Sequence, residues 1–303
     1  MSDDFFDFFE KVKEKKEVRT WDCVIENPPY QRDSNNSQKL WTKFVDISFE
    51  ICEKDGIVAL ITPPTWLNRH NPAGATIKNK DVKEINLECG KFFNVGSSFS
   101  YYIVNNSANK KGKTVVTFVD GSKKEIIVDS DSCFSMDKSS LFIEKLLRYP
   151  SKFSCVGVGK PWRSDSSTNV SKSKDSSHKY ELFHTNSESL FCKTPHPNQF
   201  DKKVILNQCS TWNPFYSDSV GFTHLHLAIL VNSKMEGEKI AKYLNSKIIN
   251  AFIKTLDAFS GARIKDTLYS IPKIDDLSCV EDMAYIKKCF GLTDEEIEYI
   301  QKF

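Results

Sequence analysis

The feature that most constrains this chain is a short apolar run that ends in a pair of prolines. Residues 21–26 read Trp-Asp-Cys-Val-Ile-Glu, and residues 27–30, Asn-Pro-Pro-Tyr, follow them directly. A short apolar run bounded by proline is typical of a β-strand. Two consecutive prolines have a fixed φ and no backbone N–H donor, so they hold a stiff loop that presents only hydrogen-bond acceptors. The sequence therefore predicts a strand with an acceptor-rich loop at its carboxyl end.

The same pattern occurs again further along the chain. Apolar residues recur at helical spacing over residues 40–51, and residues 54–56, Lys-Asp-Gly, then turn into a second apolar run at residues 57–61. Residues 62–64, Thr-Pro-Pro, end that run. Strand, proline loop, helix, glycine turn and strand make up a βαβ unit of a parallel sheet. Further strands are expected at residues 82–87 and 99–104, with a hairpin of residues 114–119 and 124–128 around Asp120-Gly121.

The tetrapeptide and its surroundings resemble one enzyme family. Residues 27–30 at the end of a strand resemble the catalytic loop of the N6-adenine DNA methyltransferases, and the order of elements over residues 21–105 resembles the γ-type arrangement. The resemblance implies an α/β fold, with a partial Rossmann-like methyltransferase sheet in residues 1–145 and an α+β target-recognition domain with C-terminal helices in residues 146–303. It also implies S-adenosylmethionine as methyl donor and double-stranded DNA as substrate.

The resemblance assigns a role to each residue of the loop. The amide oxygen of Asn27 and the carbonyl of Pro28 would accept hydrogens from the adenine amine, while Pro29 completes the stiff turn. Tyr30 would stack on a base that has been flipped out of the duplex. The residues expected to cover the other face of that base are Phe99, Tyr101 or Tyr102. Without the resemblance, the same residues predict a proline turn that closes a strand, with Tyr30 on the surface.

The donor-binding half of such an enzyme is missing from the sequence. Only 26 residues precede Asn27, whereas the common arrangement needs roughly three strands and their helices first, over about a hundred residues. No Gly-rich loop follows a first strand. The C-terminal residues 278–303 are too short to supply the donor-binding motifs instead, and they contain a single glycine, Gly291. We therefore expect S-adenosylmethionine to bind tightly only when a second subunit supplies the donor site. We also expect the strand at residues 21–26 to lack a neighbour on one side.

The first residues form an amphipathic pattern. Residues 4–16 carry acidic side chains early and lysines late, which suits a helix dipole. Phe5, Phe8, Phe9 and Val12 fall on one helical face. We expect this face to dock on the sheet or on a partner, and so to help cover the open strand.

The C-terminal half contains a polar stretch with candidate DNA contacts. Residues 164–179 are almost devoid of apolar groups, which indicates either a flexible linker or a loop ordered by DNA phosphates. In the second case Lys172 and Lys174 would contact the DNA. Residues 160–163, Lys-Pro-Trp-Arg, form either a base-stacking cluster or a solvated turn. Regular elements are expected in strands at residues 203–207 and 224–231 and in a helix at residues 238–252.

A second candidate DNA contact lies nearer the C-terminus. Residues 244–274 resemble the end of the target-recognition region of such methyltransferases, where a helix, a small-residue loop with a basic residue and a short strand follow one another. Ser260, Gly261 and Arg263 would then meet DNA phosphates. The alternative is a glycine-hinged turn with Arg263 in solvent.

Composition adds few constraints. The 42 basic and 40 acidic residues give a net charge of +2, so DNA binding has to come from local patches. Nine cysteines without a CxxC pair indicate reduced thiols in a cytoplasmic protein of bacterial or phage type. No apolar run approaches the roughly 18 residues of a membrane span. The following residues lack the spacing of a zinc site, so no metal is expected: His184, Cys192, His196, Cys209, His224 and His226.

Three functions remain open. The first is a site-specific DNA adenine-N6 methyltransferase of a restriction-modification system, or the catalytic and recognition subunit of a split one. The second is a catalytically inactive DNA-binding module with the same fold. The third is a methyltransferase that acts on RNA or on a protein glutamine. The intact loop at residues 27–30 favours the first function, and the missing donor half favours the second.

Overall fold

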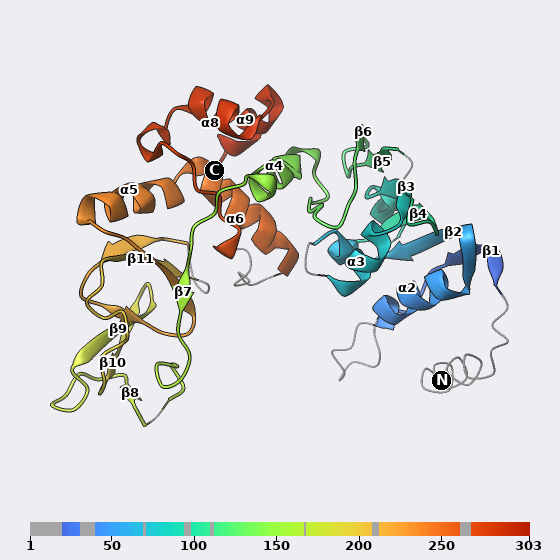
Figure 1. Ribbon diagram of the computed structural model, residues 1–303. Helices are drawn as coiled ribbons and strands as arrows, with labels where there is room; N and C mark the ends of the chain where they lie inside the picture. Colours follow the sequence, from blue (N-terminus) through green and yellow to red (C-terminus); the bar gives the residue numbers. More distant parts are fainter. Residues whose placement is uncertain are drawn as a thin grey trace. The chain divides into compact units, whose positions relative to one another are not determined.

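The computed structural model describes residues 20–30, 40–68, 71–93, 98–109, 112–166, 168–207, 212–260 and 268–303 (Figure 1). The chain divides into two compact units, Met1–Leu141 and Phe142–Phe303. Each unit has its own sheet or sheets and its own helices, and each is described by itself below.

The first unit is built on a six-stranded mixed sheet. Its strands are β1 (Trp21–Glu26), β2 (Cys52–Thr62), β3 (Asp81–Asn86), β4 (Ser100–Asn105), β5 (Thr114–Thr117) and β6 (Lys123–Ile126). They lie in the order β1-β2-β4-β3-β5-β6. β1 is parallel to β2 and β3 is parallel to β5, whereas β4 runs antiparallel between β2 and β3. The expected strands and the hairpin are thus confirmed, and Gly121 makes the hairpin turn with φ +78°.

Strand β1 forms one edge of this sheet. It joins β2 through the helix α2 (Leu40–Ile51), which confirms the expected parallel βαβ unit. Within the described residues, β2 is the only strand paired with β1. The glycine turn at Gly56 differs from expectation: β2 already begins at Cys52, and the chain bulges between the pairs Trp21–Cys52 and Cys23–Ile57. A Cβ at Gly56 would lie 2.8 Å from the Asp22 carbonyl oxygen, so the bulge requires glycine.

The helices of the first unit pack on one face of the sheet. α2 and α3 (Pro72–Lys78) contact each other, and together with the 3₁₀ helix η1 (Pro64–Leu67) and the strands they form one core. Two further 3₁₀ turns are η2 (Cys89–Phe92) and η3 (Lys138–Leu141). The largest buried side chains of this core come from α2, η1 and β4: Trp41, Trp66 and Tyr102.

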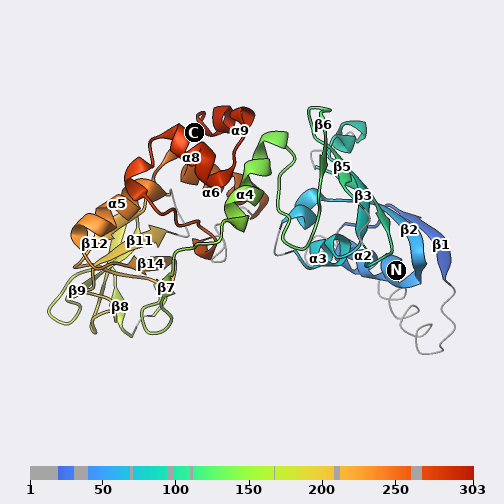
Figure 2. The same cartoon turned by 45° about the horizontal axis from the view of Figure 1, so that its top comes forward.

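The second unit combines two four-stranded sheets with a group of helices. One sheet has the order β13-β9-β10-β8 and the other β12-β11-β14-β7. In both views the helices gather on one side of this unit and the strands on the other (Figures 1 and 2). The strands are β7 (Val156–Gly157), β8 (Val170–Ser171), β9 (Tyr180–Thr185), β10 (Glu188–Cys192), β11 (Lys203–Asn207), β12 (Phe215–Ser217), β13 (Gly221–Phe222) and β14 (His226–Leu230). The helices are α4 (Phe142–Arg148), α5 (Lys234–Leu244), α6 (Lys247–Ser260), η4 (Leu277–Cys279), α8 (Met283–Phe290) and α9 (Asp294–Ile300).

Two expectations for the second unit are corrected. The single helix expected at residues 238–252 is two helices, α5 and α6, because Asn245 ends the first: its amide donates to the carbonyl of Pro214 at 2.8 Å and to that of Ala241 at 2.9 Å. The stretch at residues 164–179, expected to be either a flexible linker or a loop ordered by DNA phosphates, contains β8, which pairs with Phe191 and Cys192 of β10. Its described part is therefore integrated into a sheet, and the linker interpretation is wrong there.

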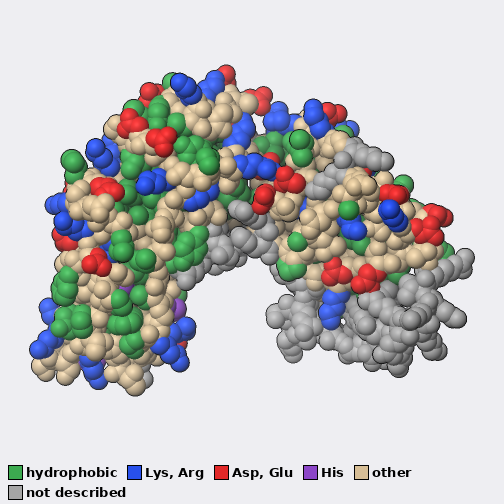
Figure 3. Space-filling view, in the orientation of Figure 1, with side chains coloured by type: hydrophobic (Ala, Val, Ile, Leu, Met, Phe, Trp, Pro, Cys, Tyr) green, Lys and Arg blue, Asp and Glu red, His purple; other side chains and the backbone are tan. Residues whose placement is uncertain are grey.

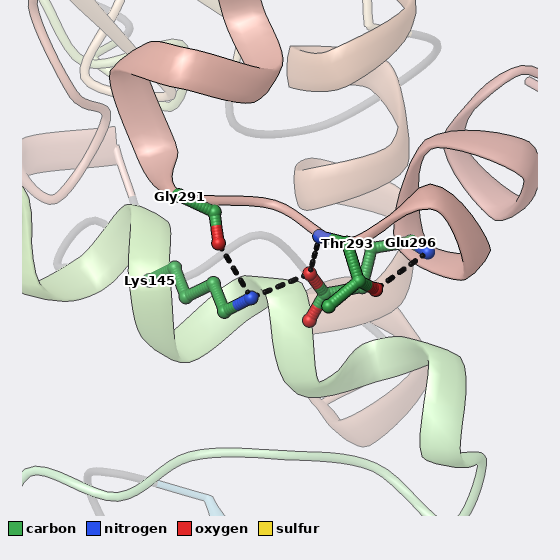
Figure 4. Close-up of polar contacts among 4 residues, drawn as sticks. All are labelled: Lys145, Gly291, Thr293 and Glu296. Carbon is green, nitrogen blue, oxygen red and sulfur yellow. Dashed lines mark hydrogen bonds and ion pairs between the residues drawn. The ribbon is translucent and has the colours of Figure 1, made fainter.

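An ion pair ties the start of the second unit to its C-terminal helices (Figure 4). The Lys145 ammonium on α4 donates to the Glu296 carboxylate at 2.6 Å and to the Gly291 carbonyl at 2.8 Å. The same carboxylate accepts the backbone N–H of Thr293 at 2.7 Å, as part of the capping box that begins α9. Glu296 is only 5 % exposed, so Lys145 neutralises a buried charge.

Candidate functional site

The loop at residues 27–30 leaves the carboxyl end of β1. Pro28 is buried, Asn27 and Pro29 are exposed, and Tyr30 is half-buried. The Tyr30 hydroxyl donates a short hydrogen bond to Oδ1 of Asn27. Burial, and to a lesser extent the neighbouring Cys89, raise the pKa of Tyr30, so the phenol remains a donor at neutral pH. The loop thus presents an amide oxygen whose orientation is fixed by the tyrosine three residues later.

An aromatic contact supports this tyrosine. The ring of Tyr30 lies 5.1 Å from that of Phe99, centroid to centroid, and Phe99 in turn lies 4.8 Å from Phe93. Phe99 is 6 % exposed, so it forms a backing for Tyr30. The two rings touch one another in a tilted arrangement. In this structure, no gap for a base separates Phe99 from Tyr30.

A polar network fixes the start of β4 close to this contact. The indole N–H of Trp66, which follows the second proline loop, donates to Oγ of Ser100 at 3.0 Å. The Ser100 hydroxyl donates to the carbonyl of Thr62 at 3.1 Å. All three side chains are fully buried. The second proline loop therefore holds the start of β4, directly after Phe99.

The two tyrosines that follow Phe99 point to opposite faces of the sheet. Tyr102 is fully buried and packs on Trp66 at 4.8 Å between ring centroids, and burial raises its pKa. The structure therefore places Tyr102 in the core, which corrects its expected role in stacking. Tyr101 is half-buried on the other face, where its hydroxyl donates to the Glu84 carboxylate at 2.7 Å. Burial and Glu84 together raise the pKa of Tyr101.

Two residues that sequence reasoning missed anchor the base of the loop. Glu26, the last residue of β1, accepts a hydrogen bond from the hydroxyl of Ser48 at 3.2 Å. Ser48 is fully buried on α2 and also approaches the Phe44 carbonyl at 2.7 Å. Burial raises the pKa of Glu26, and the hydrogen bond from Ser48 partly opposes this shift. A carboxylate at the end of an apolar strand was the only signal of this contact in the sequence.

A mostly apolar groove of about 320 Å³ runs along the sheet to this loop. Its lining comes from β1, β2 and β4 and reaches Asn27 at the loop. The lining residues are Ile25, Glu26, Asn27, Ala59, Leu60, Ile61, Tyr101, Tyr102 and Ile103.

The candidate DNA contacts of the second unit are only partly described. Lys172 is 86 % exposed at the end of β8, and its ammonium lies 3.7 Å from the Glu188 carboxylate. Lys174 is exposed in the turn that follows. Figure 3 shows several Lys and Arg side chains over the end of this unit that carries β8, β9 and β10. Ser260 ends α6 with a side chain outside the description, and Gly261 and Arg263 lie outside the described residues.

The Trp162 cluster forms a turn. Trp162 packs edge-on against His196 at 5.7 Å, and its indole N–H donates to the Thr194 carbonyl at 3.4 Å. The Arg163 guanidinium binds Asp165 at 2.9 Å. This arrangement favours the anchored turn over the base-stacking cluster, since Trp162 is packed on its own unit.

The buried histidines of the second unit are core residues. His196 and His226 are both buried, and the Nε2 atom of each lacks a hydrogen-bond partner. Burial lowers the pKa of each from 6.5 to about 4. Across the described ranges, no group of three or more His, Cys, Asp or Glu side chains is arranged to hold a metal ion. Nor does any described helix have the length and apolar character of a membrane span.

Comparisons with known proteins give a family match for part of the chain. Residues 2–93, which include the loop at residues 27–30, match the family of the Eco57I restriction-modification methylase. A search of curated proteins finds no match. Among solved structures, the chain is similar at 10 % identity and a TM-score of 0.34 to the type IIG restriction endonuclease BpuSI, covering 95 % of this chain and 50 % of that one.

Two further solved structures are similar over most of the chain. The type IIL restriction-modification enzyme MmeI, in complex with DNA, matches at 10 % identity and a TM-score of 0.44, over 95 % of this chain and 52 % of that one. A nuclease-deletion mutant of the type ISP enzyme LlaGI, with a DNA substrate mimic, matches at 11 % identity and a TM-score of 0.41, over 92 % and 42 %. The chain thus spans about half the length of these proteins or less.

Proposed function

We propose that this chain is the catalytic and DNA-reading part of a site-specific DNA adenine-N6 methyltransferase of a restriction-modification system. The observation that carries the proposal is the Asn27 amide oxygen, which Tyr30 orients at the exposed end of a parallel strand. This loop lies inside the segment that matches the restriction-modification methylase family. The match supports a role related to DNA methylation, and adenine is the base that the acceptor geometry suits.

The chemistry of adenine explains why acceptors are needed. The lone pair of the exocyclic amine is delocalised into the ring, so the amine is a poor nucleophile. Oδ1 of Asn27 and the carbonyl of Pro28 accept the two amine hydrogens and direct the lone pair out of the ring plane. Pro28 and Pro29 keep the loop rigid, so the acceptors do not have to reorganise during the reaction. The proton leaves after methyl transfer, and no strong base is required.

We assign Tyr30 to base stacking and Phe99 to its support. The ring contact at 5.1 Å holds Tyr30 from one side, which leaves its other face for a flipped adenine. This assignment replaces the expectation that Phe99 would cover the far face of the base. Tyr101 lies near the groove beside Asn27 and has its hydroxyl engaged by Glu84.

S-adenosylmethionine does not fit the described residues of this chain by themselves. The groove beside Asn27 is lined mostly by apolar side chains, and its one carboxylate, Glu26, accepts a hydrogen bond from Ser48. A glycine-rich turn that lets the backbone approach the ligand is not among the lining residues. We therefore propose that a second subunit supplies the donor site. Within the described residues β1 is an edge strand of its sheet, and this unpaired edge supports the arrangement.

We assign DNA recognition to the second unit. Lys172, Lys174 and, beyond the described residues, Gly261 and Arg263 would contact phosphates, with Ser260 at the end of α6 beside them. A non-catalytic DNA-binding module remains the second candidate, because the groove lacks the features of a donor site.

A methylation assay on the reconstituted protein tests the proposal. The chain is co-expressed with the product of the neighbouring reading frame, and methyl transfer from labelled S-adenosylmethionine to duplex DNA, RNA and protein is measured. Mass spectrometry of the digested DNA should then show N6-methyladenine. Methylated cytosine, RNA or glutamine would overturn the assignment of substrate, and specific DNA binding without transfer in any combination would favour the binding module.

A further inference from the structure

The turn between β10 and β11 presents an aromatic side chain to solvent. Residues 196–201 read His-Pro-Asn-Gln-Phe-Asp, and Phe200 is 69 % exposed. His196 and Gln199 in the same turn are each only 2 % exposed. A single exposed apolar residue is common in folded proteins, so the exposure of Phe200 is informative only through the way in which its turn is held.

Buried polar groups hold the backbone on both sides of Phe200. The ammonium of Lys203, a fully buried residue, donates to the Gln199 carbonyl at 3.2 Å and to the Asp201 carbonyl at 2.9 Å. These two carbonyls belong to the residues directly before and after Phe200. The side-chain amide of Gln199 donates to two further backbone carbonyls, at 2.7 Å and 3.0 Å. Because a buried ammonium is costly unless its hydrogen bonds are satisfied, the position of this turn is strongly fixed.

The underside of the turn is closely packed on β13. A Cβ at Gly221 would lie 2.6 Å from the Cβ of His196 and 2.8 Å from Oε1 of Gln199, so no side chain fits between the strand and the turn. The turn is therefore unable to sink and bury Phe200 without breaking the hydrogen bonds of Lys203 and Gln199. The ring stays on the surface as a preformed contact point.

Two lysines lie at the same end of this sheet. Tyr180 begins β9, Cys192 ends β10, and the two residues are paired. Phe200 packs edge-on against the Tyr180 ring at 6.5 Å between centroids. Lys179 and Lys193 are the next residues beyond the pair, and both are exposed. Since neighbouring strands are roughly 5 Å apart, two positive charges leave the sheet close together.

The carboxylates of this region do not neutralise these lysines. Glu181 accepts a hydrogen bond from the Ser189 hydroxyl at 2.6 Å, and Asp201 accepts one from the Asn198 amide at 2.8 Å. Across the described ranges, neither Lys179 nor Lys193 forms an ion pair. Like charges on adjacent strands repel one another, and a bound polyanion would relieve this repulsion. The sheet end therefore combines a fixed aromatic ring with positive charge, which suits a partner that has both phosphates and stacked rings.

We infer that this turn is a DNA-contacting element, in which Phe200 packs into a base step of a duplex while Lys179 and Lys193 contact its phosphates. The inference rests on the proposed function, which assigns DNA recognition to the second unit. Phenylalanine is one of the apolar side chains that proteins insert between base steps, and lysine is a common phosphate contact. The fixed turn lowers the ordering cost of such a contact. The other proposed DNA contacts are basic or small residues, so Phe200 adds an apolar one.

Binding of random-sequence duplex DNA to the full chain tests the inference, with fluorescence anisotropy measured at several salt concentrations. Phe200→Ala should weaken binding about tenfold and leave the slope of log affinity against log salt unchanged, because an aromatic contact releases no counterions. Phe200→Trp should retain the affinity of the unmodified chain. Replacing both Lys179 and Lys193 with alanine should reduce the magnitude of that slope by about 2.

Matched controls use the helices of the second unit. Met235 on α5 is 66 % exposed, so Met235→Ala removes an equally exposed apolar side chain and should leave the affinity unchanged. Lys239 on α5 and Lys288 on α8 are both exposed, and replacing them with alanine removes the same charge as the lysine pair. This second control should leave the salt slope unchanged.

Photo-crosslinking identifies what the ring touches. The chain carrying p-benzoylphenylalanine at position 200 should crosslink to the duplex on irradiation, and the chain carrying it at position 235 should not. If the unmodified chain binds DNA but Phe200→Ala binds equally well and position 200 gives no DNA crosslink, the inference is overturned and the proposed function stands. A crosslink from position 200 to an added protein subunit instead of DNA also contradicts the inference. If the unmodified chain binds no duplex DNA, the proposed DNA recognition fails together with it.

Discussion

The second unit should lose stability in mild acid because two of its histidines are buried without a partner for the added proton. His196 is packed between Trp162 and Phe222, with ring centroids 5.7 Å and 4.2 Å away, and its Nδ1 accepts the backbone N–H of Asn198. His226 lies against Phe183 and shares a hydrogen bond with Thr223. Protonation therefore places a positive charge among aromatic rings in both cases.

The size and sign of this effect follow from the pKa values. Each histidine has its pKa lowered from 6.5 to about 4 by burial. A group with a lowered pKa contributes stability above its unfolded-state pKa, and this stability is lost as the pH falls towards the folded-state value. Since one pKa unit corresponds to about 1.4 kcal/mol, the loss at pH 4.5 is about 2.5 kcal/mol per histidine. The pair thus removes about 5 kcal/mol, a large part of the 5–15 kcal/mol that holds a typical domain.

Urea denaturation between pH 7 and pH 4.5, together with NMR titration of the imidazoles, checks this prediction. The variant His196→Phe keeps an aromatic ring at the site and should remove about half of the loss between pH 6.5 and pH 4.5. If His196 and His226 titrate near pH 6.5, or if His196→Phe unfolds with the same pH dependence as the unmodified chain, the reasoning is refuted.

Three other predictions concern the site, the ion pair and the DNA contacts. Asn27→Ala and Tyr30→Ala should lower the rate of methyl transfer in the active complex by about 10²–10³ while the chain stays folded. Tyr30→Phe should lower it by about tenfold, since only the hydrogen bond to Asn27 is lost. Full activity in either alanine variant contradicts the site. Lys145→Met should lower the free energy of unfolding by about 3 kcal/mol, because the Glu296 carboxylate is left buried without its cation. The control Lys287→Met, at the exposed ion pair with Asp294, should lower it by less than about 1 kcal/mol. Neutralising the proposed phosphate contacts Lys172, Lys174 and Arg263 should weaken DNA binding and flatten its dependence on salt concentration. An unchanged slope of affinity against salt concentration would exclude these residues from the DNA interface.

Much of the first unit could be predicted because proline and glycine mark its boundaries. The proline pairs after β1 and β2 end both strands, and the helical spacing between them gives α2. These features are local, so a single sequence carries them.

The parts that could not be predicted depend on distant contacts or on which face a strand buries. Tyr101 and Tyr102 are adjacent in the sequence and point to opposite faces, and only the packing of Trp66 shows that Tyr102 is the core residue. Glu26 and Ser48 are 22 residues apart, and their hydrogen bond follows from how α2 packs on β1. The break between α5 and α6 depends on a hydrogen bond from Asn245 to Pro214, 31 residues earlier.

The most direct test of the central claim is calorimetric titration of S-adenosylmethionine into this chain, alone and with the proposed donor-binding subunit. The claim is that the chain positions the adenine amine through Asn27 and Tyr30 while the donor site comes from elsewhere. It predicts no measurable binding at about 100 μM chain alone and low-micromolar binding once the partner is added. A dissociation constant in the low micromolar range for the isolated chain would contradict it.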